Sequence, residues 1–223
     1  MFKANIYQNR RKILCEGLES GIIFLPGNNL VPMNYPSNTL RFRQDSNFLY
    51  YCGLDYPELN LIIDVISGET LLFGDNLTVQ DIVWEGSRTS IETMAKSSGI
   101  STIKSNSELK NYLSIINGNI HTLPTYRADQ KIFLNNTLNG SNNGSSKSLI
   151  QNVIKQRSIK SKEEISEIES ALTITAQMHE LAMKLTKDGI SEQYVVGQIE
   201  GYALSLGSRL AYPVIFTING EIL

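Results

Sequence analysis

Residues 41–53 read Arg-Phe-Arg-Gln-Asp-Ser-Asn-Phe-Leu-Tyr-Tyr-Cys-Gly, and this stretch decides how the chain folds. It places two arginines, one aspartate and four aromatic residues within thirteen positions. Aromatic side chains bury large areas in a core or an interface, while arginines stack on rings or bind carboxylates. Two interpretations stay open. The stretch is a packed corner in which Arg43 pairs with Asp45, or it is a site wall or subunit contact, because interface cores favour Tyr, Phe and Arg.

Composition and charge are those of an ordinary globular protein. The chain has 223 residues, enough for one large or two small domains, and a net charge of −2. This charge gives no indication of wholesale binding to nucleic acid or to an acidic membrane. The short basic run Arg10-Arg11-Lys12 is predicted to be a solvated helix face rather than a phosphate site.

The sequence also disfavours several classes of protein. Two cysteines, Cys15 and Cys52, do not make a disulfide framework in a chain of this length. No signal peptide is recognised at the N-terminus, and no apolar run approaches the ~18 residues that a membrane-spanning helix needs. We therefore expect a cytoplasmic protein.

Strand-like and helix-like segments alternate up to residue 138. This order predicts an α/β domain whose mixed sheet is flanked by helices. Asn5 and Ser107 are expected to cap two of the helices. Strands are expected at 21–25, 59–66, 70–73, 100–104 and 119–123, and helices at 5–18, 90–98, 108–116 and 130–138.

A polar run rich in Gly, Ser and Asn at residues 139–146 predicts a domain boundary. The expected division is a domain at 1–138, a linker and connecting helix at 139–160, and a second part at 161–223. The second part begins with a capping box, Ser161-Lys-Glu-Glu164, which opens a long helix. A second helix follows, and then a strand at 211–218. Such elements cannot cover their own apolar faces, so we expect them to be the opening pieces of a larger domain.

The chain lacks the spacings that mark catalytic or metal sites. It has no CxxC, HExxH, EF-hand or GxSxG pattern. We therefore expect no catalytic residue, no bound metal and no cofactor in this chain. His179 lies on the apolar face of a predicted helix, which favours a core histidine over a ligand. Trp84 is either a partly buried anchor or part of a site or interface.

Three segments resemble the Xaa-Pro aminopeptidases (aminopeptidase P) of the creatinase and prolidase superfamily. They are residues 42–48 with Tyr51 and Gly53, the run Trp84-Glu-Gly-Ser-Arg88, and residues 159–165. The resemblance implies a creatinase-like N-terminal domain followed by the opening helices and one strand of an α+β pita-bread domain. It further implies that this part serves oligomerisation, as a dimer, and access to the active site. The candidate access or interface residues are Trp84, Arg88, Arg43, Asp45 and Tyr51.

The resemblance also implies what the parent protein does. Enzymes of this family remove an N-terminal residue ahead of proline, using two divalent metal ions, commonly manganese, on two Asp, one His and two Glu. None of these ligands carries over onto this sequence. Residues 216–223 lack the Gly-rich run that many such enzymes carry there, so a prolidase or creatinase type stays open. A pita-bread interaction module without metals is the remaining alternative.

Overall fold

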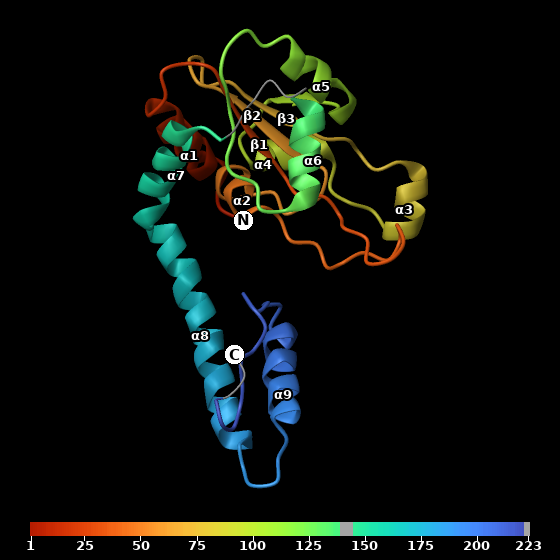
Figure 1. Ribbon diagram of the computed structural model, residues 1–223, viewed down its shortest axis with the longest axis vertical. Helices are drawn as coiled ribbons and strands as arrows, with labels where there is room; N and C mark the ends of the chain where they lie inside the picture. Colours follow the sequence, from red (N-terminus) through yellow and green to blue (C-terminus); the bar gives the residue numbers. More distant parts are fainter. Residues whose placement is uncertain (139–144, 221–223) are drawn as a thin grey trace. The chain divides into compact units, whose positions relative to one another are not determined.

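The computed structural model describes residues 1–138 and 145–220 (Figure 1). It divides into two compact units, Met1–Ile159 and Lys160–Leu223. Most of the predicted linker, residues 139–144, lies outside the described residues. The elements of the first unit are α1 (Ala4–Glu16), β1 (Ile22–Pro26), α2 (Ser46–Cys52), β2 (Asn60–Asp64), β3 (Thr70–Phe73), α3 (Val79–Glu85), α4 (Ile91–Ser97), β4 (Thr102–Lys104), α5 (Asn106–Ser114), β5 (Ile120–His121), α6 (Ala128–Thr137) and α7 (Lys147–Ser158).

A mixed sheet lies at the centre of the first unit, which confirms the predicted α/β class. Among the described residues it has five strands in the order β4-β3-β2-β1-β5. The central pairs β1–β2 and β2–β3 are antiparallel, whereas the outer pairs β1–β5 and β3–β4 are parallel. The predicted hairpin joins β2 to β3, and Gly68 adopts a positive φ of 72° in its turn.

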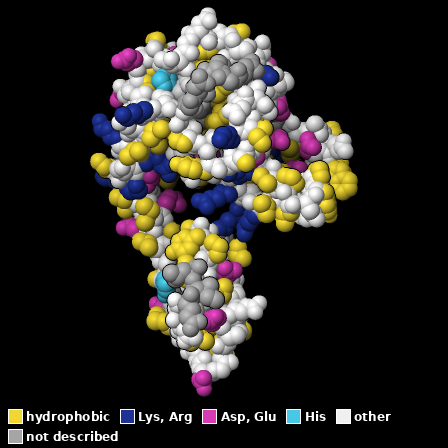
Figure 2. Space-filling model, in the orientation of Figure 1, with side chains coloured by type: hydrophobic (Ala, Val, Ile, Leu, Met, Phe, Trp, Pro, Cys, Tyr) yellow, Lys and Arg dark blue, Asp and Glu magenta, His cyan; other side chains and the backbone are white. Residues whose placement is uncertain are grey.

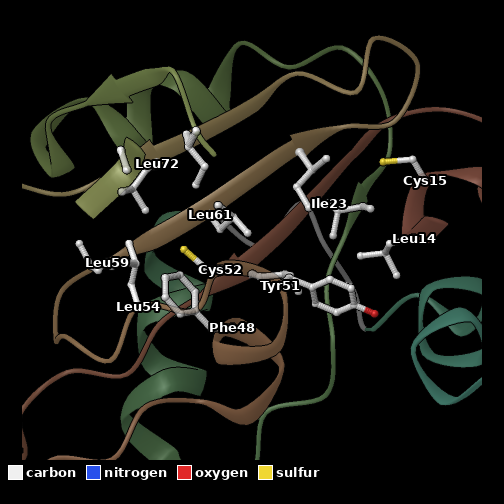
Figure 3. Packing of buried hydrophobic residues seen from close by; sticks show 14 of the residues in the cluster. Leu14, Cys15, Ile23, Phe48, Tyr51, Cys52, Leu54, Leu59, Leu61 and Leu72 are labelled. Carbon is white, nitrogen blue, oxygen red and sulfur yellow. The ribbon is translucent and has the colours of Figure 1, made fainter. Parts of the chain in front are cut away.

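Residues of the strands alternate between two cores, as the two-residue period of a strand requires. On one face, Ile23, Leu61 and Leu72 pack with residues of α1, α2, α4 and α7. On the other face, Phe24, Ile62 and Phe73 pack with residues of α5. Figure 3 shows the first core, where Phe48, Tyr51 and Cys52 of α2 lie close to the strands. Both faces of the sheet are therefore covered.

Residues 41–53 contain α2 together with its two ends. Asp45 caps the helix, because its carboxylate accepts the backbone N–H groups of Asn47 and Phe48 at 2.9 Å each. Gly53 ends the helix in the left-handed region, with φ of 77°. The packed-corner interpretation therefore describes this stretch, with one correction: the Asp45 carboxylate serves the helix N-terminus, and Arg43 forms no ion pair with it.

The prediction of a solvated basic face on α1 is wrong for Arg10 and Arg11, and right only for Lys12. Arg11 is only 3% exposed. Its guanidinium donates to the carbonyl oxygens of Tyr51 and Ser98, each at 2.9 Å, and of Gly99 at 3.1 Å. These carbonyls lie at the C-terminal ends of α2 and α4, where intrahelical partners are missing and partial negative charge accumulates. Burial lowers the pKa of Arg11, but a guanidinium stays charged in a folded protein.

Two predicted caps are also wrong. Lys3 occupies the cap position of α1 without a side-chain hydrogen bond, so Asn5 lies inside the helix. Helix α5 begins after Ser105, which forms a capping box with Glu108, so Ser107 lies in the first turn. Ser105 has the three-residue spacing to Glu108 that a capping box needs, and Ser107 does not.

The second unit consists of α8 (Lys162–Leu185), α9 (Glu192–Ser205) and irregular chain. The capping box of Ser161 and Glu164 is confirmed. The strand predicted at 211–218 is wrong: these residues are irregular, and no other strand of the described second unit is there to pair with them. None of the 24 residues of α8 is buried, so His179 is exposed rather than in a core. No described helix is long and apolar enough to cross a bilayer.

Arg11→Met tests the role of the buried guanidinium. The substitution keeps the aliphatic stem but leaves carbonyl groups at two helix ends without a donor. We expect the free energy of unfolding to fall by about 3–5 kcal/mol, measured by urea unfolding with circular dichroism. Lys12→Met on the exposed side of α1 is the control and should change it by less than about 0.5 kcal/mol. Equal effects of the two substitutions would contradict the assignment.

Candidate functional site

The structure separates the candidate residues into two groups. Asp45 and Tyr51 are structural, since Asp45 caps α2 and Tyr51 is fully buried. The Tyr51 hydroxyl lies 3.0 Å from the side-chain oxygen of Gln156 on α7 and donates to it, and burial raises the pKa of this phenol. Trp84, Arg88 and Arg43 lie at or near the surface. The candidate surface is therefore built around the last three residues.

Trp84 lies on α3, a short helix with a capping box at its N-terminus. Thr78 and Asp81 form a capping box: the Asp81 carboxylate accepts the Thr78 N–H at 2.8 Å. None of the α3 residues is buried, and Trp84 is 81% exposed. Val79 and Val83 are exposed to a similar degree. Large apolar side chains on an exposed helix mark an interaction surface rather than a core.

Arg88 fixes the segment that follows α3. Its guanidinium stacks over the ring of Tyr56 at 5.5 Å from the centroid. The Tyr56 carbonyl in turn accepts the side-chain N–H of Gln44 at 2.7 Å. The Gln44 side-chain oxygen accepts the backbone N–H groups of Asn28 and Asp45. The segment after α3 and the two ends of the loop 28–43 therefore meet at Tyr56.

The loop 28–43 carries apolar side chains that have no place in the core. Exposed members are Leu30, Met33, Tyr35 and Leu40. In Figure 1 this loop and α3 extend to the same side of the unit. Figure 2 shows hydrophobic side chains gathered on this projecting part. We call residues 28–43 and 75–88 together the α3 lobe.

A second cluster, which sequence reasoning missed, fixes the last turn of α7. Arg157 donates to the side-chain oxygen of Asn47 and lies over the Tyr50 ring at 5.3 Å. Arg10 covers the same ring at 3.8 Å. Asn47 and Arg157 are more than 100 residues apart in the sequence, so no local sequence pattern reveals their contact. This cluster orients the end of the first unit.

Two pockets lie in the described part of the first unit. One pocket of about 200 Å³ is lined by Asn28, Asn47, Gln130 and neighbouring residues, and its Arg127 pairs with Asp129 at 2.7 Å. Another of about 610 Å³ is lined in part by Arg11 and Cys15. Burial raises the pKa of the Cys15 thiol to about 11. A protonated thiol is a poor nucleophile, so this cysteine does not indicate covalent catalysis.

The described residues also offer no fit for a metal centre. No group of three or more His, Cys, Asp or Glu side chains in that part of the chain could hold an ion. The ring nitrogens of His121 are both engaged, one with the Ser146 hydroxyl at 2.8 Å and the other with the Ser20 carbonyl at 2.9 Å.

Comparison with known proteins identifies relatives over most of the chain. The family model described as "Aminopeptidase P, N-terminal domain" matches residues 7–123. The Xaa-Pro aminopeptidase of Escherichia coli is 27% identical, with 96% of this chain and 52% of that protein covered. A probable Xaa-Pro aminopeptidase of Fusarium vanettenii is also 27% identical, covering 78% of this chain and 37% of that protein. The chain thus spans about a third to a half of the length of these relatives.

Solved structures show the same fold. Aminopeptidase P from Escherichia coli in a low-pH form superposes with a TM-score of 0.77 at 23% identity, covering 94% of this chain and 51% of that one. A zinc-substituted form of the same protein in complex with product matches at the same TM-score and identity, over 93% of this chain. The fold of the first unit and the helices that follow it are therefore those of the first half of aminopeptidase P.

The thiols give a pH-dependent prediction. Burial raises the pKa of Cys15 and of Cys52 to about 11 each, so both thiols stay protonated until the pH approaches that value. At pH 8 we expect the native chain to react with a disulfide reagent on the order of 100-fold more slowly than an ordinary thiol. Lys12→Cys, on the exposed face of the same helix as Cys15, supplies the fast control. If the native chain reacted as fast as the variant, the burial of both thiols would be contradicted. Unfolding in guanidinium should expose both thiols and make them react at the ordinary rate.

Proposed function

The chain belongs to the aminopeptidase P family through its N-terminal domain, and from this we propose that it is the non-catalytic portion of a metal-dependent Xaa-Pro aminopeptidase. The whole enzyme would release an N-terminal residue ahead of proline, with two divalent metal ions, manganese among the candidates, held by residues outside those described. The match to the family over residues 7–123 carries this proposal. A cytoplasmic location stays a prediction.

The length of the relatives supports an accessory role for this part. The relatives that match are about two to three times as long as the region they share with this chain. In such a protein the first unit would act as an accessory domain.

We propose that the accessory role is oligomerisation and control of access to the active site, through the α3 lobe. The exposure of Trp84 on a helix with no buried residue supports this assignment. A tryptophan left in water is an effective anchor for a protein contact, because it buries a large area at low entropic cost. Arg88 supports the lobe through its stack on Tyr56. Arg43 is the last residue of the loop that belongs to the lobe, whereas Tyr51 and Asp45 act through the packing of α2.

Hydrolysis of a peptide that begins Xaa-Pro tests the proposed function. The assay compares this chain with the same chain continued past Leu223 along its natural coding sequence, both with added manganese. We expect cleavage only by the longer protein, because only it can supply metal ligands. Cleavage by this chain alone would contradict the accessory role. Failure of both would favour a pita-bread interaction module, and cleavage of other substrates a prolidase or creatinase type.

A further inference from the structure

A buried glutamine in the first turn of α6 has a side-chain oxygen without a donor. Gln130 is only 7% exposed. Its side-chain nitrogen donates to the carbonyl oxygen of Gly27 and, at 3.2 Å, to the side-chain oxygen of Asn28. Its side-chain oxygen Oε1 is buried and receives no hydrogen bond from the described part of the chain. Because buried acceptors in folded proteins are generally satisfied, this oxygen points to a donor that the described residues do not supply.

The orientation of the Gln130 amide is fixed by its neighbours. A carbonyl oxygen is an acceptor only, so the atom that Gln130 presents to Gly27 must be the nitrogen. A flipped amide would place its oxygen against the oxygens of Gly27 and Asn28. Asn28 is held in turn, because its side-chain nitrogen donates to the Arg43 carbonyl at 2.8 Å. The unsatisfied atom is therefore the oxygen.

Gln130 lines a pocket of about 200 Å³ at the carboxyl end of two neighbouring strands. Strands β1 and β5 are parallel, and the lining residues are those that end β1 and those that follow β5, at 25–26 and 123–127. Ligands of open α/β sheets bind outside the carboxyl ends of the strands. A cavity of about 150 Å³ holds benzene, and a single water needs far less. The pocket therefore has room for a small organic molecule.

The charges around the pocket favour a cation. The Asp45 carboxylate lines it, and its oxygen Oδ1 makes both bonds of the α2 cap. Arg127 also lines it, but its guanidinium donates to the Asp129 carboxylate at 3.0 and 2.7 Å, and this pair is neutral. Arg157 donates to Asn47 at the rim and does not itself line the pocket. The negative charge of Asp45 would repel an anion and attract a cation.

We propose that this pocket binds a small primary amine as its ammonium ion. An ammonium group has three N–H donors and no acceptor, so it matches both the unsatisfied oxygen of Gln130 and the carboxylate of Asp45. The alkyl part would meet the apolar walls of the pocket, which are Leu25, Pro26, Leu123 and Pro124. Apolar walls with a few converging polar groups are typical of small-molecule sites. The inference goes beyond the proposed function, since it assigns a ligand to the first unit itself.

Titration of the full chain with butylammonium chloride at neutral pH tests the site. We expect saturable binding with a dissociation constant on the order of 1 mM, measured by calorimetry. Three compounds of similar size separate the contributions to binding. Butyrate carries the opposite charge, butanol carries none, and butyltrimethylammonium keeps the charge but has no N–H donor. Each of the three should bind at least about tenfold more weakly.

Substitutions connect the binding to named groups. Asp45→Asn removes the charge but keeps an oxygen for the α2 cap, because Asn caps helices about as well as Asp. It should weaken butylammonium binding by about tenfold, whereas Asp55→Asn, at an exposed residue outside the pocket, should leave the affinity unchanged. Thr125→Phe should fill the pocket and abolish binding without changing any partner of Gln130. Circular dichroism checks that each variant keeps its fold.

Nuclear magnetic resonance locates the ligand independently of affinity. The side-chain NH₂ signals of Gln130, identified by their loss in Gln130→Met, should shift as butylammonium is added. Those of Gln8, which lies on α1 outside this pocket, should not.

Four results would overturn the inference. They are no saturable binding of butylammonium, binding that Asp45→Asn and Thr125→Phe leave unchanged, equally tight binding of butyrate, and signals of Gln130 that do not shift. Binding of a lysine-bearing peptide without binding of the free amine would also overturn it, in favour of a protein partner. None of these results depends on the peptidase assay, so the pocket and the proposed function can fail separately.

Discussion

The buried guanidinium of Arg11 joins three helices of the first unit. A charge removed from water is costly unless its donors are all well placed, and the price of burial here is offset by carbonyl groups of Tyr51, Ser98 and Gly99. Those carbonyls lie at the C-terminal ends of α2 and α4, so the Arg11 side chain connects α1 to both helix ends. One face of the sheet is covered in consequence, with Phe48 and Cys52 packed beneath it (Figure 3).

Helix α3 differs from the helices around Arg11 because it buries none of its residues, and the proposed function depends on this difference. Around Arg11, each helix end is satisfied by another element and the apolar side chains are buried. In α3 the N-terminus is capped by Thr78 in a capping box with Asp81, and no residue is buried. Because α3 buries none of its residues in its own domain, its apolar side chains stay exposed and available to a partner. The rigid core thus positions the lobe at its rim through Tyr56 and Arg88.

Local patterns in the sequence predict the parts of this structure that local forces determine. The strands followed from apolar runs between turn residues, and the capping box of Ser161 and Glu164 followed from its spacing. The burial of Arg11 was missed because its carbonyl partners lie 40 to 88 residues away. The strand at 211–218 was wrong because an apolar run with β-branched residues becomes a strand only beside another strand. The sequence motif identified Trp84 and Arg88 as candidate residues. It did not predict that the loop 28–43 and the segment after α3 meet at Tyr56.

Native-state hydrogen exchange tests most directly whether Arg11 makes α1, α2 and α4 a single cooperative unit. The account predicts that backbone amides in these three helices exchange with the same opening free energy, close to that of global unfolding. Amides of α3, which has no buried residue, should exchange at a much lower opening free energy. If α2 or α4 opens well before α1, the guanidinium does not hold them together and the account is contradicted.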